Sequence, residues 1–277
     1  MGDPEAGVVV TLDRRGPVAW ITLDRPQSMN AIDRNLAAQL GTAVEEAAAD
    51  PRVRVLVITG SGRAFSAGAD LKALAPPDGE LGAEAIVTFV ARAAAVIEAV
   101  ATVPKPVIAA VNGLALAGGL ELALACDLII ASDQAQLGDA HANYGLLPGA
   151  GGSIRLARRV GVPAAKRLMF SGDILAATDL VAWGLVDEVV PADRLLARVG
   201  ALAATLAAKS PAGLAAMKRL ADLALDLSLT DGLEAERREL APHVHSPDLA
   251  EGLAAFRSRR PPVFGAAPAP FAATRES

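Results

Sequence analysis

The chain has 277 residues, of which 52% are hydrophobic, 21% charged and only 3% aromatic, and its formal net charge is -5. This composition is typical of a globular protein with an aliphatic core and excludes an intrinsically disordered chain. The negative charge argues against nucleic acid as a partner, and the single cysteine, Cys126, excludes an intrachain disulfide and a cysteine-based zinc site.

The chain offers no clear targeting or membrane segment. Its polar start lacks a signal-peptide pattern. The longest uncharged apolar stretch, near 106–120, is shorter than the ~20 residues that a membrane span needs. We therefore expect a cytoplasmic protein with no membrane partner and no metal site.

Strands alternate with helices up to about residue 190, which predicts an α/β fold. The predicted strands are short apolar runs, and they span 8–12, 18–23, 53–59, 107–111, 128–131, 135–137 and 186–190. The predicted helices span 34–49, 86–100, 120–126, 152–159, 164–170 and 179–183. A polar turn at 13–16 joins the first two strands as a hairpin, and Asn30 or Asp33 caps the first helix. Residues 60–68 and the proline-containing cluster at 75–79 are predicted loops.

After Pro191 the sequence predicts only helices. They span 194–208, 211–225, 233–240 and 249–257. We therefore predict an α/β core at 1–195 and a helical C-terminal region at 196–277, which mediates oligomerisation and ends in a frayed Pro/Ala-rich tail.

The most informative stretch runs from Pro104 to Asp127. A buried strand, an Asn-Gly turn and a pair of glycines lead into an apolar helix, whose first turn carries Glu121. A glutamate in such apolar surroundings is costly unless it has a partner or stays protonated. Glu121 is therefore either a functional carboxylate or a helix-start acid that the helix dipole favours.

Four motifs in order resemble the enoyl-CoA hydratase/isomerase (crotonase) superfamily. They are RAFSAGADLK at 63–72, NGLALAGGLELALACD at 112–127, LGDAHANYGLLPGAGG at 137–152, and the SGD…WGLVDEVV pattern at 171–190. The resemblance covers roughly residues 8 to 264. It implies a crotonase-like spiral of repeated ββα units with a helical C-terminal region, assembled as a homotrimer or hexamer.

The same resemblance implies an enoyl-CoA hydratase, a lyase of fatty acid metabolism. Such an enzyme adds or removes water at the 2,3-double bond of an acyl-CoA thioester, with coenzyme A as part of the substrate and no permanently bound cofactor. The backbone N–H groups of Ala67 and Gly118 would hold the thioester oxygen, on which an enolate places negative charge. The CoA site would comprise Arg25, near the phosphates, and Ala64, Ala69, Asp70, Leu71 and Lys72.

The resemblance also places acid–base groups. Two glutamates flank the thioester in the hydratases that the chain resembles; Glu121 matches the first, but His141 stands at the position of the second. A neutral imidazole can act as a base or an acid near pH 7, and Asp139 can orient it if the backbone turns between them.

The histidine leaves other interpretations open. His141 is either a replacement for the second carboxylate or a packed loop residue with no chemical role. The substitution also favours another reaction on a specialised acyl-CoA, such as isomerisation, decarboxylation or C–C bond hydrolysis. A third interpretation is a non-catalytic acyl-CoA binder that has kept the pocket.

Overall fold

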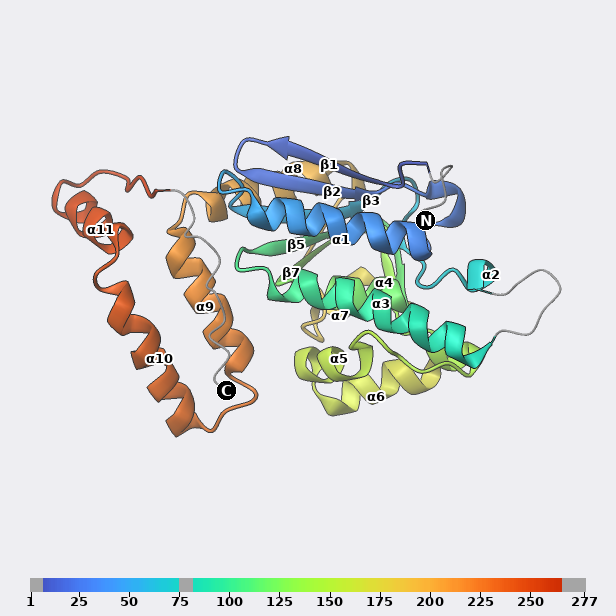
Figure 1. Ribbon diagram of the computed structural model, residues 1–277. Helices are drawn as coiled ribbons and strands as arrows, with labels where there is room; N and C mark the ends of the chain where they lie inside the picture. Colours follow the sequence, from blue (N-terminus) through green and yellow to red (C-terminus); the bar gives the residue numbers. More distant parts are fainter. Residues whose placement is uncertain (1–6, 75–81, 266–277) are drawn as a thin grey trace.

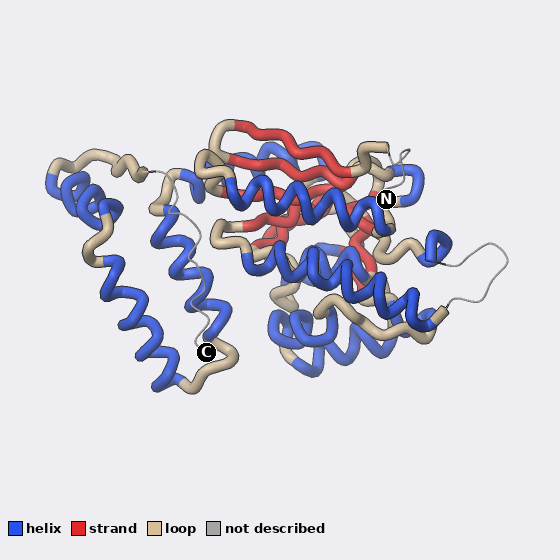
Figure 2. The backbone as a smooth tube through the Cα atoms, viewed as in Figure 1, coloured by secondary structure: helices blue, strands red, loops and turns tan. Residues whose placement is uncertain are grey.

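The computed structural model describes residues 7–74 and 82–265. The predicted loop at 75–79 and the end of the tail lie outside the described residues. Figure 1 shows a layered body of sheets and helices, from which three C-terminal helices extend as an arm. Strands lie between layers of helices (Figure 2), as expected for an α/β fold.

The larger sheet has six strands in the order β1-β2-β3-β5-β7-β10. They are β1 (Val10–Arg15), β2 (Val18–Leu23), β3 (Val55–Gly60), β5 (Val107–Val111), β7 (Leu128–Ser132) and β10 (Glu188–Val190). Only β1 and β2 pair antiparallel. The hairpin is confirmed, but its turn is shorter than predicted because Asp13–Arg15 still pair with β2 and the chain reverses at Gly16, whose φ is +59°.

A second sheet of four very short strands, in the order β4-β6-β8-β9, lies beside the first. They are β4 (Ala64–Ser66), β6 (Leu114–Leu116), β8 (Gln136–Gly138) and β9 (Leu175–Ala176). In the chain, β3 leads to β4, β5 to β6 and β7 to β8, and helices follow each pair. This repetition of two strands and a helix confirms the predicted ββα fold. The strands β4, β6 and β9 were not predicted.

Helices cover both faces of the larger sheet. One face carries α1 (Arg34–Ala49) and α3 (Ala83–Thr102), which lie side by side in Figure 1. The bounds of α1 match the prediction, and its N-terminus is capped because Leu36 N–H donates to Asp33 Oδ1 at 2.7 Å. Around the smaller sheet lie α2 (Leu71–Leu74), α4 (Gly118–Leu124), α5 (Gly152–Val160), α6 (Val162–Ser171) and α7 (Ala177–Val181).

The other face of the sheet is covered by α8 (Leu195–Ala207), whose Leu195, Val199, Ala203 and Ala207 are buried with strand residues such as Val57. This helix therefore belongs to the core. The boundary predicted between 195 and 196 falls one helix too early, because apolar periodicity does not reveal what a helix packs against.

The arm consists of α9 (Pro211–Leu223), α10 (Leu229–His243) and α11 (Pro247–Arg257). Two ion pairs connect its first part to the body: Lys218 Nζ lies 3.0 Å from Asp127 Oδ2, and Arg158 pairs with Asp226. These contacts join α9 and the turn that follows it to the body.

Within the described ranges, α3 alone is long and apolar enough to cross a membrane by length and composition; the bent pair 192–207 and 211–223 passes only if it is counted as one span. Phe89, Ile97 and Val100 of α3 are buried in the protein, and the charged residues Arg92 and Glu98 interrupt its apolar sequence. We assign α3 to the cover of the core because it packs beside α1 and its three buried side chains belong to the main hydrophobic core.

Candidate active site

The site is built where two short strands of the smaller sheet end. The segment after β4 runs beside Ile32: Ile32 N–H donates to Gly68 O at 2.7 Å, and Asp70 N–H donates to Ile32 O at 2.9 Å. This parallel bridge uses the groups on either side of Ala69 and leaves the Ala69 N–H with no acceptor among the described residues. The Ala69 N–H is thus available to a ligand.

The prediction that Ala67 supplies an oxyanion donor is wrong. The Ala67 N–H donates to Met29 O at 3.0 Å, so it is already used. The donor that meets Gly118 is Ala69, two residues later: a methyl group placed on Gly118 would lie 3.5 Å from the Ala69 nitrogen and 3.4 Å from Gly68 Cα.

Gly118 is the first residue of α4, so its N–H has no partner within the helix. The preceding residue, Ala117, has φ 47° and ψ −116°, a conformation that L-residues rarely adopt. Such strain costs about 1–3 kcal/mol and is characteristic of functional sites. The turn directs the start of α4 toward the segment that contains Ala69, and the pair can hold one anionic oxygen.

Glu121 lies in the first turn of α4 and is only 4% exposed. Its Oε1 accepts two hydrogen bonds, from Ala150 N–H at 2.7 Å and from Gly152 N–H at 2.9 Å. Gly152 opens α5, whose N-terminal dipole favours a carboxylate. The other oxygen, Oε2, has no hydrogen-bond partner in the described part of the chain, so it remains for a substrate or a water molecule.

The two donors to Glu121 were not predicted. The signal was present in the sequence as the glycine cluster at 149–152. A methyl group on Gly152 would lie 3.0 Å from Cγ and Oε1 of Glu121, so only glycine allows this approach without displacement. A cluster of glycines before a helix therefore marks a cradle for an anionic group.

His141 forms a buried pair with Asp139. The backbone turns at Ala140, whose φ is 56°, and a short 3-10 helix begins at His141. This turn brings His141 Nδ1 to 3.1 Å from Asp139 Oδ1, with the two residues 9% and 2% exposed. A carboxylate on Nδ1 fixes the orientation of the ring and leaves Nε2 for chemistry.

The neighbours of His141 shift its pKa. Burial lowers the pKa of His141, but the hydrogen bond and negative charge of Asp139, with the charge of Glu121, outweigh it and raise the pKa above the ordinary 6.5. His141 and Glu121 thus interact electrostatically, although they come from different ββα units.

Arg25 lies at the edge of the site in a structural network. Its guanidinium lies 3.0 Å from Asp70 Oδ2 and 3.4 Å from Asp33 Oδ2, and it donates to Ala31 O at 2.8 Å. The side chain therefore fixes the segments on both sides of the Ile32 bridge, and the two carboxylates offset its positive charge.

The remaining predicted CoA residues separate into two groups. Ala64 is fully buried in β4, and its carbonyl accepts from Asn30 Nδ2 at 2.7 Å, so its side chain cannot line a channel. Ala69 is exposed beside the oxyanion position, and Leu71 and Lys72 are exposed on α2. These three stay candidates for contacts with a CoA moiety.

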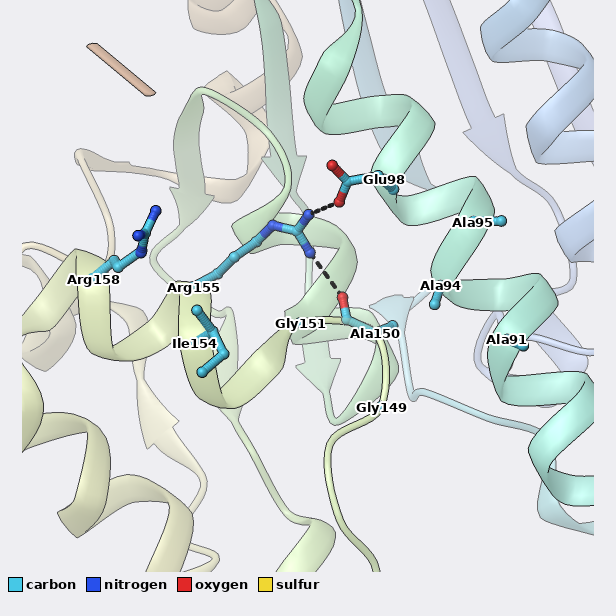
Figure 3. A pocket seen from close by; sticks show the side chains of 10 residues that line it. All are labelled: Ala91, Ala94, Ala95, Glu98, Gly149, Ala150, Gly151, Ile154, Arg155 and Arg158. Atoms are coloured by element: carbon cyan, nitrogen blue, oxygen red, sulfur yellow. Dashed lines mark hydrogen bonds and ion pairs between the residues drawn. The ribbon is translucent and has the colours of Figure 1, made fainter. Parts of the chain in front are cut away.

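A cavity of about 540 Å³ lies next to the site but does not contain its reacting groups. Figure 3 shows that it is bordered by α3, by the loop 149–151 and by α5. Its lining includes Arg155 and Glu98, whereas Glu121 and His141 are not among the lining residues. Across the described ranges, no three His, Cys, Asp or Glu side chains are grouped to hold a metal ion.

Comparison with known proteins gives consistent matches along the chain. A model of the family described as enoyl-CoA hydratase/isomerase matches residues 13–267. The Mycobacterium tuberculosis protein named "Probable enoyl-CoA hydratase echA8" is 40% identical over 93% of this chain and 97% of its own length. The 2,3-dehydroadipyl-CoA hydratase of Escherichia coli is 38% identical over 91% of this chain and 97% of its own length. The crystal structure of an enoyl-CoA hydratase from Bacillus anthracis superposes with a TM-score of 0.88 at 34% identity, covering 93% of this chain and 99% of that one.

Proposed function

The chain belongs to the enoyl-CoA hydratase/isomerase family and is an enoyl-CoA hydratase-like enzyme, and we propose that it hydrates the 2,3-double bond of an enoyl-CoA thioester with Glu121 and His141 as its acid–base pair. The observation that carries this proposal is a buried carboxylate with one oxygen free, together with a buried histidine that Asp139 holds and whose pKa the charge of Glu121 helps to raise. Addition of water to a double bond needs one group that takes a proton from water and one that gives a proton to carbon, and positioned side chains of this kind supply both.

The reaction proceeds by addition of water to C3. Oε2 of Glu121 takes a proton from water while the water oxygen bonds to C3. The electron pair of the double bond moves to the thioester oxygen, and the Ala69 and Gly118 N–H groups stabilise the enolate. Removing one such donor typically costs about 2.7–4 kcal/mol of transition-state stabilisation.

The second half of the reaction returns a proton to carbon. His141, whose pKa is raised by Asp139 and Glu121, acts in its protonated form and gives the proton on Nε2 to C2 as the enolate collapses to the thioester. One proton leaves water and one reaches C2, so water is added without net proton uptake. The dehydration of a 3-hydroxyacyl-CoA follows the same steps in reverse.

The coenzyme A moiety is part of the substrate in this proposal. Ala69, Leu71 and Lys72 are exposed next to the oxyanion position and are suited to contact it. Arg25 supports the loop that carries Ala69 through its pair with Asp70, so it contributes indirectly.

We also propose a homotrimer or hexamer. The arm of α9–α11 exposes Leu229 by 80% and Phe256 by 84%, and a monomer rarely leaves such apolar surface open to water. Sedimentation velocity distinguishes these assemblies from a monomer. The cytoplasmic location and the place in fatty acid metabolism remain predictions from the sequence.

The test is turnover of crotonyl-CoA, followed by loss of the enoyl-thioester absorbance. We expect Glu121→Gln to abolish turnover while acyl-CoA affinity stays nearly unchanged, and His141→Gln to lower kcat by about 10²–10⁴-fold. His245→Gln, which changes an exposed histidine of the arm, is the matched control. A wild-type kcat retained in Glu121→Gln would refute the mechanism.

The contact between Asp139 and His141 also suits a second reaction, hydrolysis of a carbon–carbon bond. A neutral histidine oriented by a carboxylate can activate water against a carbonyl carbon, which would cleave a C–C bond in a β-keto thioester. Product analysis with unsaturated, malonyl-type and β-keto thioesters separates the two reactions, and hydration products alone would exclude the second.

A further inference from the structure

We propose that Arg155, held by Glu98, is a positioning residue that keeps the loop 149–152 in the conformation in which it binds the catalytic carboxylate. Arg155 touches neither Glu121 nor, in the mechanism above, the substrate. It acts through the backbone of the loop. The inference rests on the proposed function only where it concerns the rate, because the state of the loop can be measured separately.

The backbone of the loop explains how a side chain can act at this distance. Glu121 Oε1 accepts from Ala150 N–H and Gly152 N–H, which belong to the peptide groups 149–150 and 151–152. The peptide group between them, 150–151, presents the Ala150 carbonyl. Arg155 Nη1 donates to that carbonyl at 2.8 Å. Arg155 therefore restrains the peptide group that links the two donor groups, and with it the ψ of Ala150 and the φ of Gly151, which set how the two donors lie relative to each other.

The sequence makes this conformation depend on an external support. Gly151 has φ +99°, a value that L side chains rarely adopt, and a methyl group there would lie 2.1 Å from Arg155 Nη1. The N-terminus of α5 has no side-chain cap. Two adjacent glycines and an uncapped helix start leave the loop few local restraints, so the guanidinium supplies the restraint.

Glu98 holds the guanidinium in place. Figure 3 shows Arg155 between the Glu98 carboxylate on α3 and the Ala150 carbonyl. The Arg155 side chain is 22% exposed and that of Glu98 is 62% exposed. The pair is therefore partly open to water on the Glu98 side, while the contact with Ala150 is the more sheltered one.

The same helix offers a matched control. Arg158 lines the same cavity one turn along α5, but it pairs with Asp226 of the arm and has no contact with the loop. In Figure 3 its side chain points away from Ala150. Both arginines have a guanidinium with one carboxylate partner, so their substitution by methionine removes similar charge and leaves similar bulk.

The experiment compares Arg155→Met, Arg155→Lys and Arg158→Met for crotonyl-CoA turnover and for amide hydrogen exchange at Ala150 and Gly152. We expect Arg155→Met to lower kcat by about 10- to 100-fold, as displacements near 1 Å in an active site do, while KM changes less than about twofold. Lysine can still donate to the carbonyl, so Arg155→Lys should recover most of kcat. Exchange at the two amides should be at least about tenfold faster in Arg155→Met.

Arg158→Met should match wild type in kcat and in exchange at both amides. Glu98→Gln is a milder test that also serves if Arg155→Met does not fold, and it should change kcat and exchange in the same direction. A folded Arg155→Met with wild-type kcat, or an equal fall in kcat for Arg158→Met, would overturn the proposal. If the wild-type protein hydrates no enoyl-CoA, the proposed function fails. Unchanged amide exchange in Arg155→Met would instead overturn the role of Arg155 in holding the loop.

Discussion

Replacing Gly152 by alanine tests the cradle of Glu121 most directly. The added methyl group would lie 3.0 Å from Cγ and Oε1 of Glu121 and from Cβ of Pro148, about 0.4 Å inside ordinary van der Waals contact. Gly152 does not have a positive φ, so the effect is steric and not a backbone strain. Either the carboxylate moves or the Gly152 N–H turns away from it.

The size of the effect follows from the lost hydrogen bond. A hydrogen bond to a charged group contributes about 1.5–3 kcal/mol, and about 1.4 kcal/mol corresponds to a tenfold change in rate. We therefore expect Gly152→Ala to lower kcat for crotonyl-CoA by about 10- to 100-fold. Overpacking of this kind also lowers the free energy of unfolding by about 1–3 kcal/mol, which chemical denaturation measures.

Gly232→Ala on α10 is the control, because no heavy atom lies within 4 Å of the added methyl group. This helix should gain up to about 1 kcal/mol from the better propensity of alanine, with kcat unchanged. A folded Gly152→Ala protein with the kcat of wild type would show that the position of Glu121 Oε1 is immaterial to catalysis, and the assignment of the site would fail.

Two further substitutions test the charge of His141 and the strain at Ala117. Since His141 must be protonated to act as the acid, kcat should fall as the pH rises through its raised pKa. Asp139→Asn removes a charge that raises this pKa, so in this variant the fall in kcat should occur at lower pH. A profile of kcat against pH between about pH 5 and 9 measures the difference. An unmoved profile would contradict the pairing. Ala117→Gly should raise the free energy of unfolding, measured by urea denaturation, by about 1 kcal/mol. Glycine relieves the strained φ, and this gain exceeds the cost of the greater entropy of the unfolded chain. A less stable variant would show that Ala117 is not strained.

Much of the fold could be predicted because it follows local rules. The helix 34–49 has its cap and its apolar stripe in the sequence, and its bounds match the structure. The strands β4, β6 and β9 could not be found in this way, since two or three residues carry no periodicity. Their pairing with one another, and not their composition, makes them strands.

The site, too, was predictable where it follows from local sequence and not where it depends on distant partners. The motifs pointed to Glu121 and His141, and the turn at Ala140 that brings Asp139 to His141 is the condition under which the sequence predicts that Asp139 orients the ring. The assignment of Ala67 as an oxyanion donor failed because whether an N–H is free depends on partners that are distant in the sequence. Met29 takes one donor, and Ile32 pairs with the residues on either side of the other. No pattern within the motif contains that information.

The repeated ββα architecture has a consequence for how this chemistry can be transferred or divided. Ala69 follows β4, Gly118 follows β6, and Glu121 reaches donors 29 and 31 residues further along the chain. No single unit therefore contains an oxyanion hole together with a supported carboxylate. The smallest part of the chain that could be transferred with its site intact is therefore three consecutive ββα units with their glycines. Grafting the segment around Ala69 or the one around Gly118 alone onto another scaffold would transfer the sequence of the site without its geometry.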